Sequence, residues 1–352
     1  MRPDPAHIET DKIIDRMEKR IAKEYAQAHK ETSEKLNDYL RRFETKDRTW
    51  QQWVKDGKKT QKEYQEWAKG QVLMGKRWEA MRDVLAEDYS NAQKLAQSVV
   101  NGYMPDVYAV NHNYATFTIE KGAKMDTSYT LYSRETVERL LRDNPKLYHT
   151  PGRDLSKKIA LGKVKAWDKQ RIQSVMLQGI LQGESIPNLT KRLEAVTDGE
   201  HAAAIRNART MATGVQNAGR IDAYQRANDM GIRTRKTWVA TLDERTRYAH
   251  RELDGQTVDI DEPFEVDGEK IMFPGDPDAD GSMVYNCRCT MISQIEKYEI
   301  DTTDERLSPD GKIGDMTYDE WKEARTTSQP ITAQEEKNEA YRQKYIREYR
   351  GH

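Results

Sequence analysis

A change of periodicity at Gly231 divides the chain into two kinds of structure. Before it, apolar residues recur every three or four positions over long stretches, as Ile13, Met17 and Ile21 do, which is the spacing of one face of an α-helix. After it, the segment RTRKTWVAT at 233–241 has a period of two, which is typical of a β-strand. We therefore expect a mainly α protein with a small α+β module near its C-terminal end.

Proline, glycine and charge patterns suggest where the regions begin and end. We predict a helical N-terminal region at 1–150, a helical portion at 151–230, a small α+β module at 231–298 and a charged helical tail at 299–352. The first boundary is placed at Pro151-Gly152. Residues 101–132 mix Pro, Gly and Asn with β-branched and aromatic runs, so we predict an irregular or β-hairpin insertion there. In the tail, Thr317 with Glu320 and Thr332 with Glu335 are spaced as helix capping boxes, and Tyr341, Tyr345 and Tyr349 stripe a final helix.

Residues 163–230 are predicted to form three helices. The first extends to about Ile180, the second passes through Leu189 and Val196, and the third is Ala-rich and ends at Gly231. Residues 1–230 carry 40 Lys and Arg against 32 Asp and Glu, a modest basic excess. Candidates for contact with DNA phosphates are the four arginines of the third helix, Arg206, Arg209, Arg220 and Arg226. The alternative is a solvated helix face or a subunit contact, because the arginines do not form a dense run.

The composition is that of a protein with much solvated helix surface. Charged residues make up 33% of the chain and hydrophobic residues only 36%, so long helix faces must contact water. No apolar run approaches the roughly 20 residues that span a bilayer, and the first residues lack the apolar stretch of a secretion signal. We expect no membrane partner and no export by the general secretory route.

Both cysteines of the chain, Cys287 and Cys289, lie in the short stretch YNCRCTM at 285–291. Two thiols cannot build a disulfide framework, and a disulfide between residues two apart closes a strained ring, so we expect reduced thiols. If this stretch is a β-strand, both thiols lie on one face and Arg288 on the other. The thiols can then converge with His250.

The residues around the cysteines are typical of turns. Asp243 and Arg245 can pair and hold the loop before His250. In the FPGDP segment Pro274 fixes φ, Gly275 permits a reversal, and Asp276 can accept hydrogen bonds from amides two residues on. Asp254-Gly255 and the hairpin tip at 266–269 supply further turns. The residues to which we assign a structural role in this module are Trp238, Asp243, Arg245, His250, Asp254, Gly255, Pro274, Gly275, Asp276, Asn286, Cys287, Arg288 and Cys289.

A group formed by the two thiols and His250 could have one of three roles. The first is packing of small buried side chains beside an oriented histidine, which needs no cofactor and is what we expect. The second is a zinc site with His250, Cys287 and Cys289 as ligands and Asp254 or Asp276 as the fourth. The third is catalysis, either by a cysteine nucleophile with His250 as base or by a nuclease-like centre of His250, Asp254 and Asn286.

The order of these short motifs resembles a known family. A Trp-containing strand, D-x-R-T-R at 243–247, H-x-x-L-D-G at 250–255, P-G-D-P at 274–277 and N-C-R-C at 286–289 are similar to the C-terminal domain of tailed-phage minor head proteins, also called phage head morphogenesis or Mu F-like proteins. The resemblance covers about residues 160–300, with the Ala- and Arg-rich helix in its expected place upstream. The first 150 residues carry no matching motif.

The resemblance implies a structural, non-enzymatic protein of the phage head. It implies association with the portal protein, inside or near the head, and a part in head assembly, DNA packaging or DNA delivery. Further implied partners are the major capsid or scaffolding protein and double-stranded DNA, and the implied location is the virion, after assembly in the cytoplasm of the bacterial host. The alternative function is a Cys/His or nuclease-like enzyme domain carried on a helical region.

Overall fold

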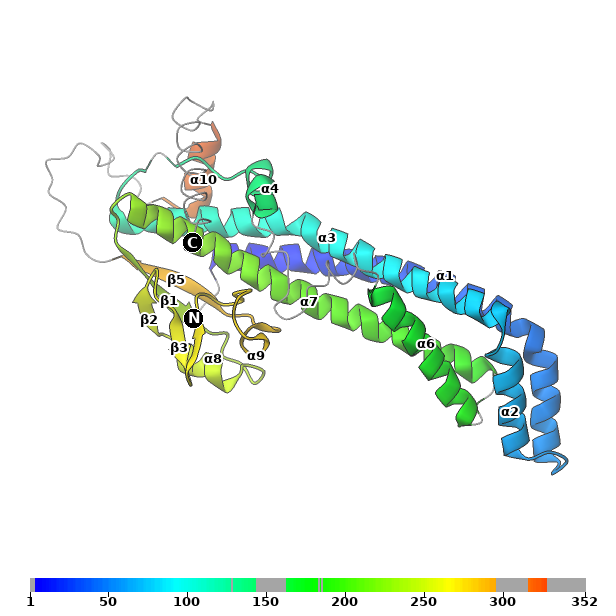
Figure 1. The fold of residues 1–352 in the computed structure, drawn as a ribbon. Coiled ribbons are helices and arrows are strands. Elements are labelled where there is room, and N and C mark those ends of the chain that lie inside the picture. Colours follow the sequence, from blue (N-terminus) through cyan, green and yellow to red (C-terminus); the bar gives the residue numbers. More distant parts are fainter. Residues whose placement is uncertain are drawn as a thin grey trace, which may run out of the picture.

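The protein is an elongated helical bundle with a small module of strands at one end (Figure 1). The computed structural model describes residues 4–127, 129–143, 163–182, 184, 186–295 and 316–327. Its helices in the bundle and tail are α1 (Pro5–Lys55), α2 (Gln61–Val72), α3 (Lys76–Ala123), α4 (Arg134–Asp143), α6 (Lys163–Leu181), α7 (Ile186–Asp229) and α10 (Tyr318–Thr327). The module contains β1 (Thr234–Val239), α8 (Tyr248–Leu253), β2 (Thr257–Asp259), β3 (Phe264–Val266), β4 (Glu269–Ile271), α9 (Gly281–Val284) and β5 (Thr290–Ile295). The predicted class, mainly α with a small α+β module, is confirmed.

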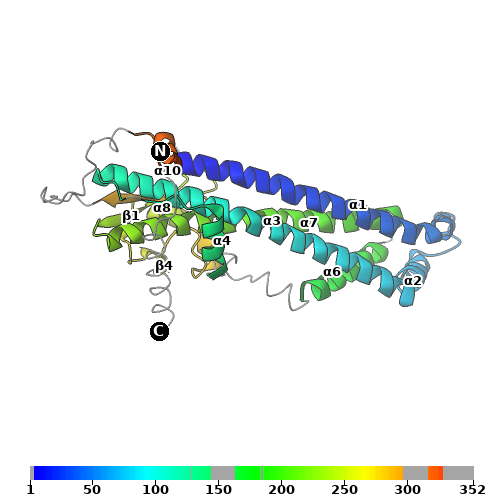
Figure 2. The ribbon, with the colours of Figure 1, turned by 90° about the horizontal axis from the view of Figure 1, so that it is seen from above.

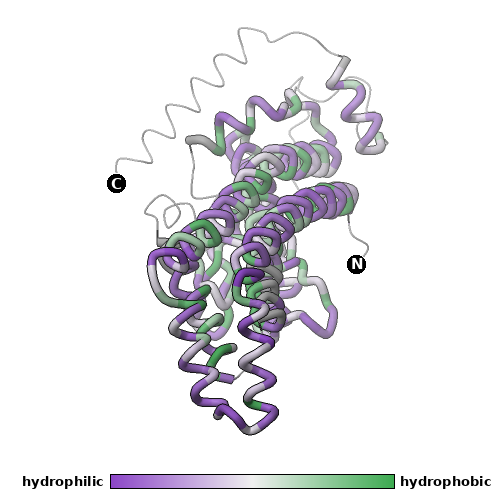
Figure 3. Tube along the Cα trace, turned by 90° about the vertical axis from the view of Figure 1, so that its right-hand side faces the viewer, coloured by the Kyte–Doolittle hydropathy of each residue, from purple (hydrophilic) through white to green (hydrophobic). Residues whose placement is uncertain are grey.

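Three long helices, α1, α3 and α7, form the body of the bundle. They lie side by side in both views, with α2 and α6 at the end opposite the strands (Figures 1 and 2). At 51 residues, α1 alone is roughly 75 Å long at 1.5 Å per residue. Polar residues predominate along the outer sides of these helices (Figure 3). Among the described residues, no helix has the length and apolar character that a transmembrane span requires.

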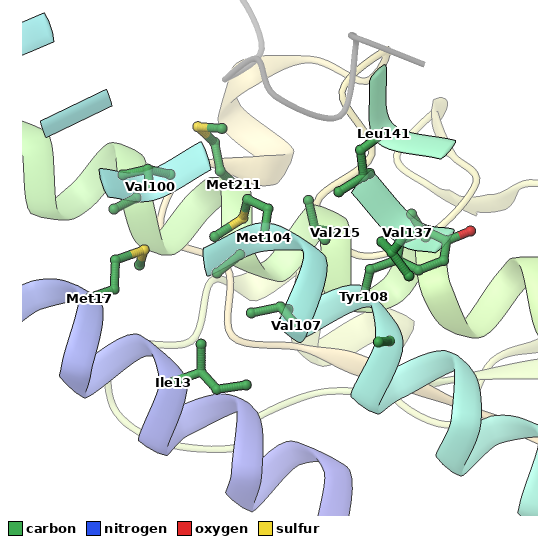
Figure 4. Packing of buried hydrophobic residues seen from close by; sticks show 14 of the residues in the cluster. Ile13, Met17, Val100, Met104, Val107, Tyr108, Val137, Leu141, Met211 and Val215 are labelled. Atoms are coloured by element: carbon green, nitrogen blue, oxygen red, sulfur yellow. The ribbon is translucent and has the colours of Figure 1, made fainter. Parts of the chain in front are cut away.

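The bundle has one apolar core near the module and another near α2. In the first, Ile13 and Met17 of α1 meet Met104 of α3 and Met211 and Val215 of α7 (Figure 4). The second contains Leu36, Tyr39, Trp78, Ile172 and Leu189, contributed by α1, α3, α6 and α7. Because four helices separated in sequence share these cores, residues before 144 and after 162 belong to one packed body.

The predicted insertion at 101–132 is wrong over most of its length, because α3 continues as a helix to Ala123. Residues with strand-like preferences are buried, Val107 in the core shared with α1 and α7 and Phe117 against Trp321 of α10, and this burial outweighs local propensity. Pro105 is accommodated inside the helix. The chain leaves α3 only at Lys124, whose positive φ of 53° ends the helix.

The prediction of two helices between 186 and 230 is also wrong, because α7 is continuous from Ile186 to Asp229. Leu193 packs in the core near α2 and Ala208 in the core near the module, so burial on both sides carries the helix through Gly199. Pro187 lies in the first turn, where a helix has no need of its missing N–H. The boundary at 151 lies outside the described residues, and the division into four regions stays a prediction.

The module is built on an antiparallel sheet with strand order β2-β1-β5. The predicted strand at 233–241 is confirmed as β1, which pairs Lys236 with Val258 and with Ser293. The predicted hairpin tip is confirmed as well. It joins β3 to β4 through Asp267 and Gly268, whose positive φ values of 52° and 82° match the type I′ turn.

The tail returns to the bundle through α10. The predicted capping box is confirmed, since the Glu320 carboxylate accepts from the Thr317 amide and the Thr317 hydroxyl accepts from the Glu320 amide. Trp321 is fully buried, and its indole Nε1 donates to Glu120 of α3 at 2.6 Å. The other tail features predicted from sequence, from Thr332 to Tyr349, lie outside the described residues.

Candidate functional site

The two cysteines and His250 converge in the buried interior of the module. Each of the three residues is only 2% exposed. His250 Nδ1 lies 3.4 Å from the Sγ of Cys289 and 3.7 Å from the Sγ of Cys287, and the three atoms all lie within 4.8 Å of one another. The convergence predicted from the short motifs is therefore present, and the thiols are reduced.

The orientation of His250 is set by a hydrogen bond on the far side of its ring. Nε2 lies 2.8 Å from the carbonyl oxygen of Met283 in α9. Because a carbonyl only accepts, Nε2 carries the proton and Nδ1 presents its lone pair to the sulfurs. The ring also packs edge-to-face on Trp238, which is fully buried on β1, with ring centroids 5.6 Å apart. Helix α8 thus places a fixed acceptor beside both thiols.

The backbone of the cysteine segment is held by α7 rather than by a β-ladder. The strand β5 begins only at Thr290, so the predicted strand at 284–291 is wrong for the cysteines themselves. Asn286, with a positive φ of 55°, turns the chain after α9. The Thr213 hydroxyl then donates to the Cys287 carbonyl at 2.7 Å, and the Asn217 amide donates to the Cys289 carbonyl at 3.2 Å. These bonds supply partners that a neighbouring strand would otherwise give.

Arg288 pairs with Asp243 and also lines the recess beside the sulfurs. Its two terminal nitrogens contact the two carboxylate oxygens at 2.5 and 2.7 Å. These hydrogen bonds hold the pKa of Asp243 well below its ordinary value, against a smaller opposing effect of burial. The predicted pairing of Asp243 with Arg245 is present as a long ion pair of 4.0 Å and as a hydrogen bond of 3.0 Å from the Arg245 amide, whereas the closer partner, Arg288, was not predicted.

The two thiols share their protons unequally. The hydrogen bond from the Cys287 thiol lowers the pKa of Cys289, and burial opposes it. The same hydrogen bond and burial raise the pKa of Cys287. The amide of Cys289 also donates to the Cys287 sulfur at 3.4 Å. The pair therefore favours a single thiolate, which is the form that binds metals and attacks electrophiles.

The two aspartates predicted as alternative fourth zinc ligands have other partners. Asp254 accepts a hydrogen bond from the Ala240 amide at 2.8 Å and shapes the turn completed by Gly255, whose φ is 80°. Asp276 accepts from the amide two residues on, as predicted, at 2.9 Å, and also from the Met272 amide at 3.1 Å. Neither belongs to the group around His250. The nuclease-like centre is incomplete, since Asn286 lines the recess beside His250 but Asp254 does not.

The PGDP turn anchors the module on α7 by backbone contact. Gly275 has a φ of 82°, and a Cβ placed on it would lie 2.6 Å from the Gly214 nitrogen. A Cβ on Gly214 would in turn lie 2.6 Å from the Gly275 carbonyl oxygen. The buried Pro274 accepts from the Asn217 side chain through its carbonyl at 3.0 Å. Close backbone contact therefore requires glycine at both positions. At Gly275 the positive φ favours glycine as well.

Three of the four arginines proposed for DNA contact are engaged within the protein. Arg209 pairs with Glu18 of α1, and Arg226 lies over the ring of Tyr129 at 5.0 Å. Arg220 is only 2% exposed, so its predicted contact with DNA is wrong. Of the four, Arg206 alone is both exposed and without a partner among the described interactions.

The sequence contained a signal for the surface of α7 that holds the module, and it was missed. Thr210, Thr213, Asn217 and Arg220 recur at spacings of three and four within an Ala-rich helix and form a polar stripe on one face. All four are buried and donate hydrogen bonds, three of them to the cysteine segment or β5 and Thr210 back to its own helix. Thr210 also accepts from the Asn286 amide at 3.0 Å.

Lys236 was also missed. It is fully buried on β1, where its Nζ donates to the Ile260 carbonyl at 2.8 Å and to the Met272 carbonyl at 3.0 Å. Burial lowers the pKa of this lysine to about 8. A charged residue beside Trp238 in an alternating strand gave no sign of which face would be inside.

Comparison with known proteins finds similarity to a family of phage proteins. Residues 170–292 match the model of the family described as Phage Mu protein F like protein, which confirms the resemblance seen in the short motifs. The chain is 26% identical to the minor head protein GP7 of Bacillus phage SPP1, over 90% of this chain and 96% of that protein. No solved structure matches the chain significantly.

Two bacterial proteins are similar over a smaller share of their length. The NAD(+)–arginine ADP-ribosyltransferase EFV of Enterococcus faecalis is 28% identical over 66% of this chain, and an uncharacterized protein of Haemophilus influenzae is 25% identical over 60%. The chain spans 45% and 42% of the length of these two proteins.

Proposed function

From the Phage Mu protein F like region at 170–292 and the similarity to a phage minor head protein along nearly the whole of both chains, we propose that this protein is a structural minor component of a phage head. The observation that carries the proposal is the extent of the second match. It covers 90% of this chain and 96% of the relative, so the helical N-terminal region is included along with the short motifs. A shared length and order of regions supports a shared structural task.

The bundle is suited to a structural task because its two ends differ. One end carries the compact module, and the other is formed by α2, α6 and the turn between α2 and α3 (Figure 1). At this second end, Trp53, Met74 and Leu181 are exposed by 37%, 60% and 56%. Leu181 lies next to α2, because its carbonyl accepts a hydrogen bond from Gln65. Exposed apolar side chains also occur in the module, where Leu242 and Tyr248 are exposed by 65% and 69%, so both ends of the molecule offer apolar contact residues.

We assign this α2 end to contact with the portal protein and keep the major capsid or scaffolding protein as alternative partners. DNA contact through the arginines of α7 is not part of the proposal, since three of the four are engaged within the protein. The proposed role places the protein in the virion head near the portal, after assembly in the host cytoplasm.

The proposed role is non-enzymatic. The thiols are buried and the recess beside them has room for roughly one water molecule, which does not favour a Cys/His enzyme acting on a large substrate. The activity named for the enterococcal relative is not proposed here, because this chain spans less than half of that protein.

Co-expression with the portal protein of the same phage tests the proposal. A complex that stays together on size-exclusion chromatography over a range of salt concentrations is expected, because its contact surface is apolar. Met74→Glu at the α2 end should weaken the complex at least tenfold. Met230→Glu, which alters an exposed methionine just beyond the C-terminal end of α7, is the matched control and should leave it intact. Separate elution of the two wild-type proteins at every salt concentration would rule out direct portal contact.

A further inference from the structure

We propose that His250, Cys287 and Cys289 bind one zinc ion through Nδ1 and the two Sγ atoms, with the fourth position open to the recess beside them. This site is independent of the proposed role in the head, because it rests only on the geometry of the module. The structure supports it through the spacing of the three atoms, the second contacts of each ligand, and the surroundings of the fourth position.

The three atoms have the spacing of a tetrahedral zinc site. With Zn–S bonds of about 2.3 Å and Zn–N bonds of about 2.0 Å, tetrahedral angles separate a nitrogen from a sulfur by about 3.6 Å. The two observed distances from His250 Nδ1 to the sulfurs, 3.4 and 3.7 Å, lie on either side of this value. Two of the three ligand–ligand distances therefore match a tetrahedral site, and the two sulfurs lie within 4.8 Å of each other.

Each ligand is oriented by a second contact. His250 donates from Nε2 to the Met283 carbonyl, which leaves Nδ1 as the ligating nitrogen and is the usual arrangement behind a zinc-bound histidine. The Cys287 sulfur accepts from the Cys289 amide, a bond that stabilises a thiolate. Asn217 and Thr213 of α7 hold the carbonyls of the two cysteines. The ligands are thus fixed before any ion arrives.

The chemistry of the ligands selects the ion. Two thiolates and one imidazole suit zinc, whereas magnesium and calcium prefer oxygen ligands. Two thiolates with one divalent cation are electrically neutral, so the complex avoids the cost of a buried uncompensated charge.

The fourth position is assigned to a water molecule. In addition to the ligands, the recess beside the sulfurs is lined by Thr241, Arg245, Thr246, Arg247, Asn286 and Arg288. Its volume of about 10 Å³ is close to what one water needs. The aspartates expected from sequence as fourth ligands are occupied with backbone amides, so the chain supplies three ligands.

Titration of the intact chain with cobalt and zinc tests the site. The purified protein is stripped with a chelator under reducing conditions, checked for native helix content by circular dichroism, and titrated with Co²⁺. One Co²⁺ per chain should bind and give the near-ultraviolet charge-transfer band of cobalt–thiolate bonds, and one equivalent of Zn²⁺ should abolish that band. Zinc should also raise the melting temperature, because it binds the folded chain.

Two variants complete the test. Cys289→Ser should lose the cobalt band and bind zinc at least 100-fold more weakly, whereas Asp254→Asn, which changes a carboxylate outside the group, should bind as the wild type does. Should Cys289→Ser fail to fold, the wild-type titration decides alone. Folded wild-type protein that shows no cobalt band and takes up no zinc at equimolar concentration overturns the proposal, as does a folded Cys289→Ser variant that retains both.

Discussion

Replacing Arg220 by alanine should destabilise the protein more than any exposed arginine substitution on the same helix. The guanidinium joins three parts of the fold, since it donates to Asn111 of α3 at 3.0 Å, to the Met291 carbonyl of β5 at 3.0 Å and to Asp4 before α1 at 2.9 Å. Removing one member of a buried ion pair costs about 3–5 kcal/mol, and here it would leave the Asp4 carboxylate, 17% exposed, with the His7 amide as its remaining partner.

The remaining acceptors add a smaller cost. The Met291 carbonyl keeps a hydrogen bond from the Tyr224 hydroxyl at 3.3 Å, whereas the Asn111 oxygen loses the guanidinium, at a cost of about 1 kcal/mol. The expected total for Arg220→Ala is therefore about 4–6 kcal/mol. Arg206→Ala, on an exposed face of α7, is the control and should change the stability by no more than about 0.5 kcal/mol.

Urea unfolding followed by tryptophan fluorescence and circular dichroism measures the effect. A chain of this length need not unfold in a single step, so the first transition is compared between variants. A double-mutant cycle with Asp4→Ala isolates the ion pair and should give a coupling of at least about 2 kcal/mol. An Arg220→Ala variant as stable as Arg206→Ala would refute the assignment of Arg220 as a buried junction and would restore it as a candidate for DNA contact.

Three further substitutions test other contacts of the fold. Burial favours protonation of Asp4, but Arg220 outweighs this effect and holds the pKa of the carboxyl below 3.8. The stabilisation by Asp4 is therefore present above pH 3.8 and is lost as the pH falls further. Asp4→Asn should lower the stability at pH 7 and flatten the plot of unfolding free energy against pH below about pH 4. Gly275→Ala should cost about 2 kcal/mol more than Gly255→Ala in thermal or urea unfolding, because both have φ near 80° but only the first meets the backbone of α7. Trp321→Ala should cost about 3–5 kcal/mol locally and expose α10 to limited proteolysis, and an unchanged digestion pattern would contradict the docking of α10 on α3.

The sequence predicted those helices and turns whose signals lie within a few neighbouring residues. Amphipathic spacing gave the long helices, and Asp267-Gly268 gave the hairpin, because both signals lie within a few residues of the structure they specify. The helix through Phe117 was missed since its strand-like residues are stabilised by burial against helices distant in sequence. A local pattern cannot report such burial.

The candidate site followed the same rule. The convergence of His250 with the cysteines was predictable from the ordered motifs, but the partner of Asp243 was not. Arg245 is two residues away in sequence and was chosen for that reason, whereas Arg288 reaches Asp243 only because β1 and β5 are neighbours in the sheet. The burial of Arg220 was unforeseen for a related reason, since its partners come from three separate segments.

Quantitative mass spectrometry of purified particles of the phage that encodes this chain tests the central claim most directly. The claim that this is a structural minor head protein predicts that the chain is found in DNA-filled particles at a constant ratio well below that of the major capsid protein. The ratio should be unchanged by treating the particles with high salt and nuclease, because the protein is held by protein contacts within the head. Particles of normal mass and infectivity that contain none of this chain would contradict the claim.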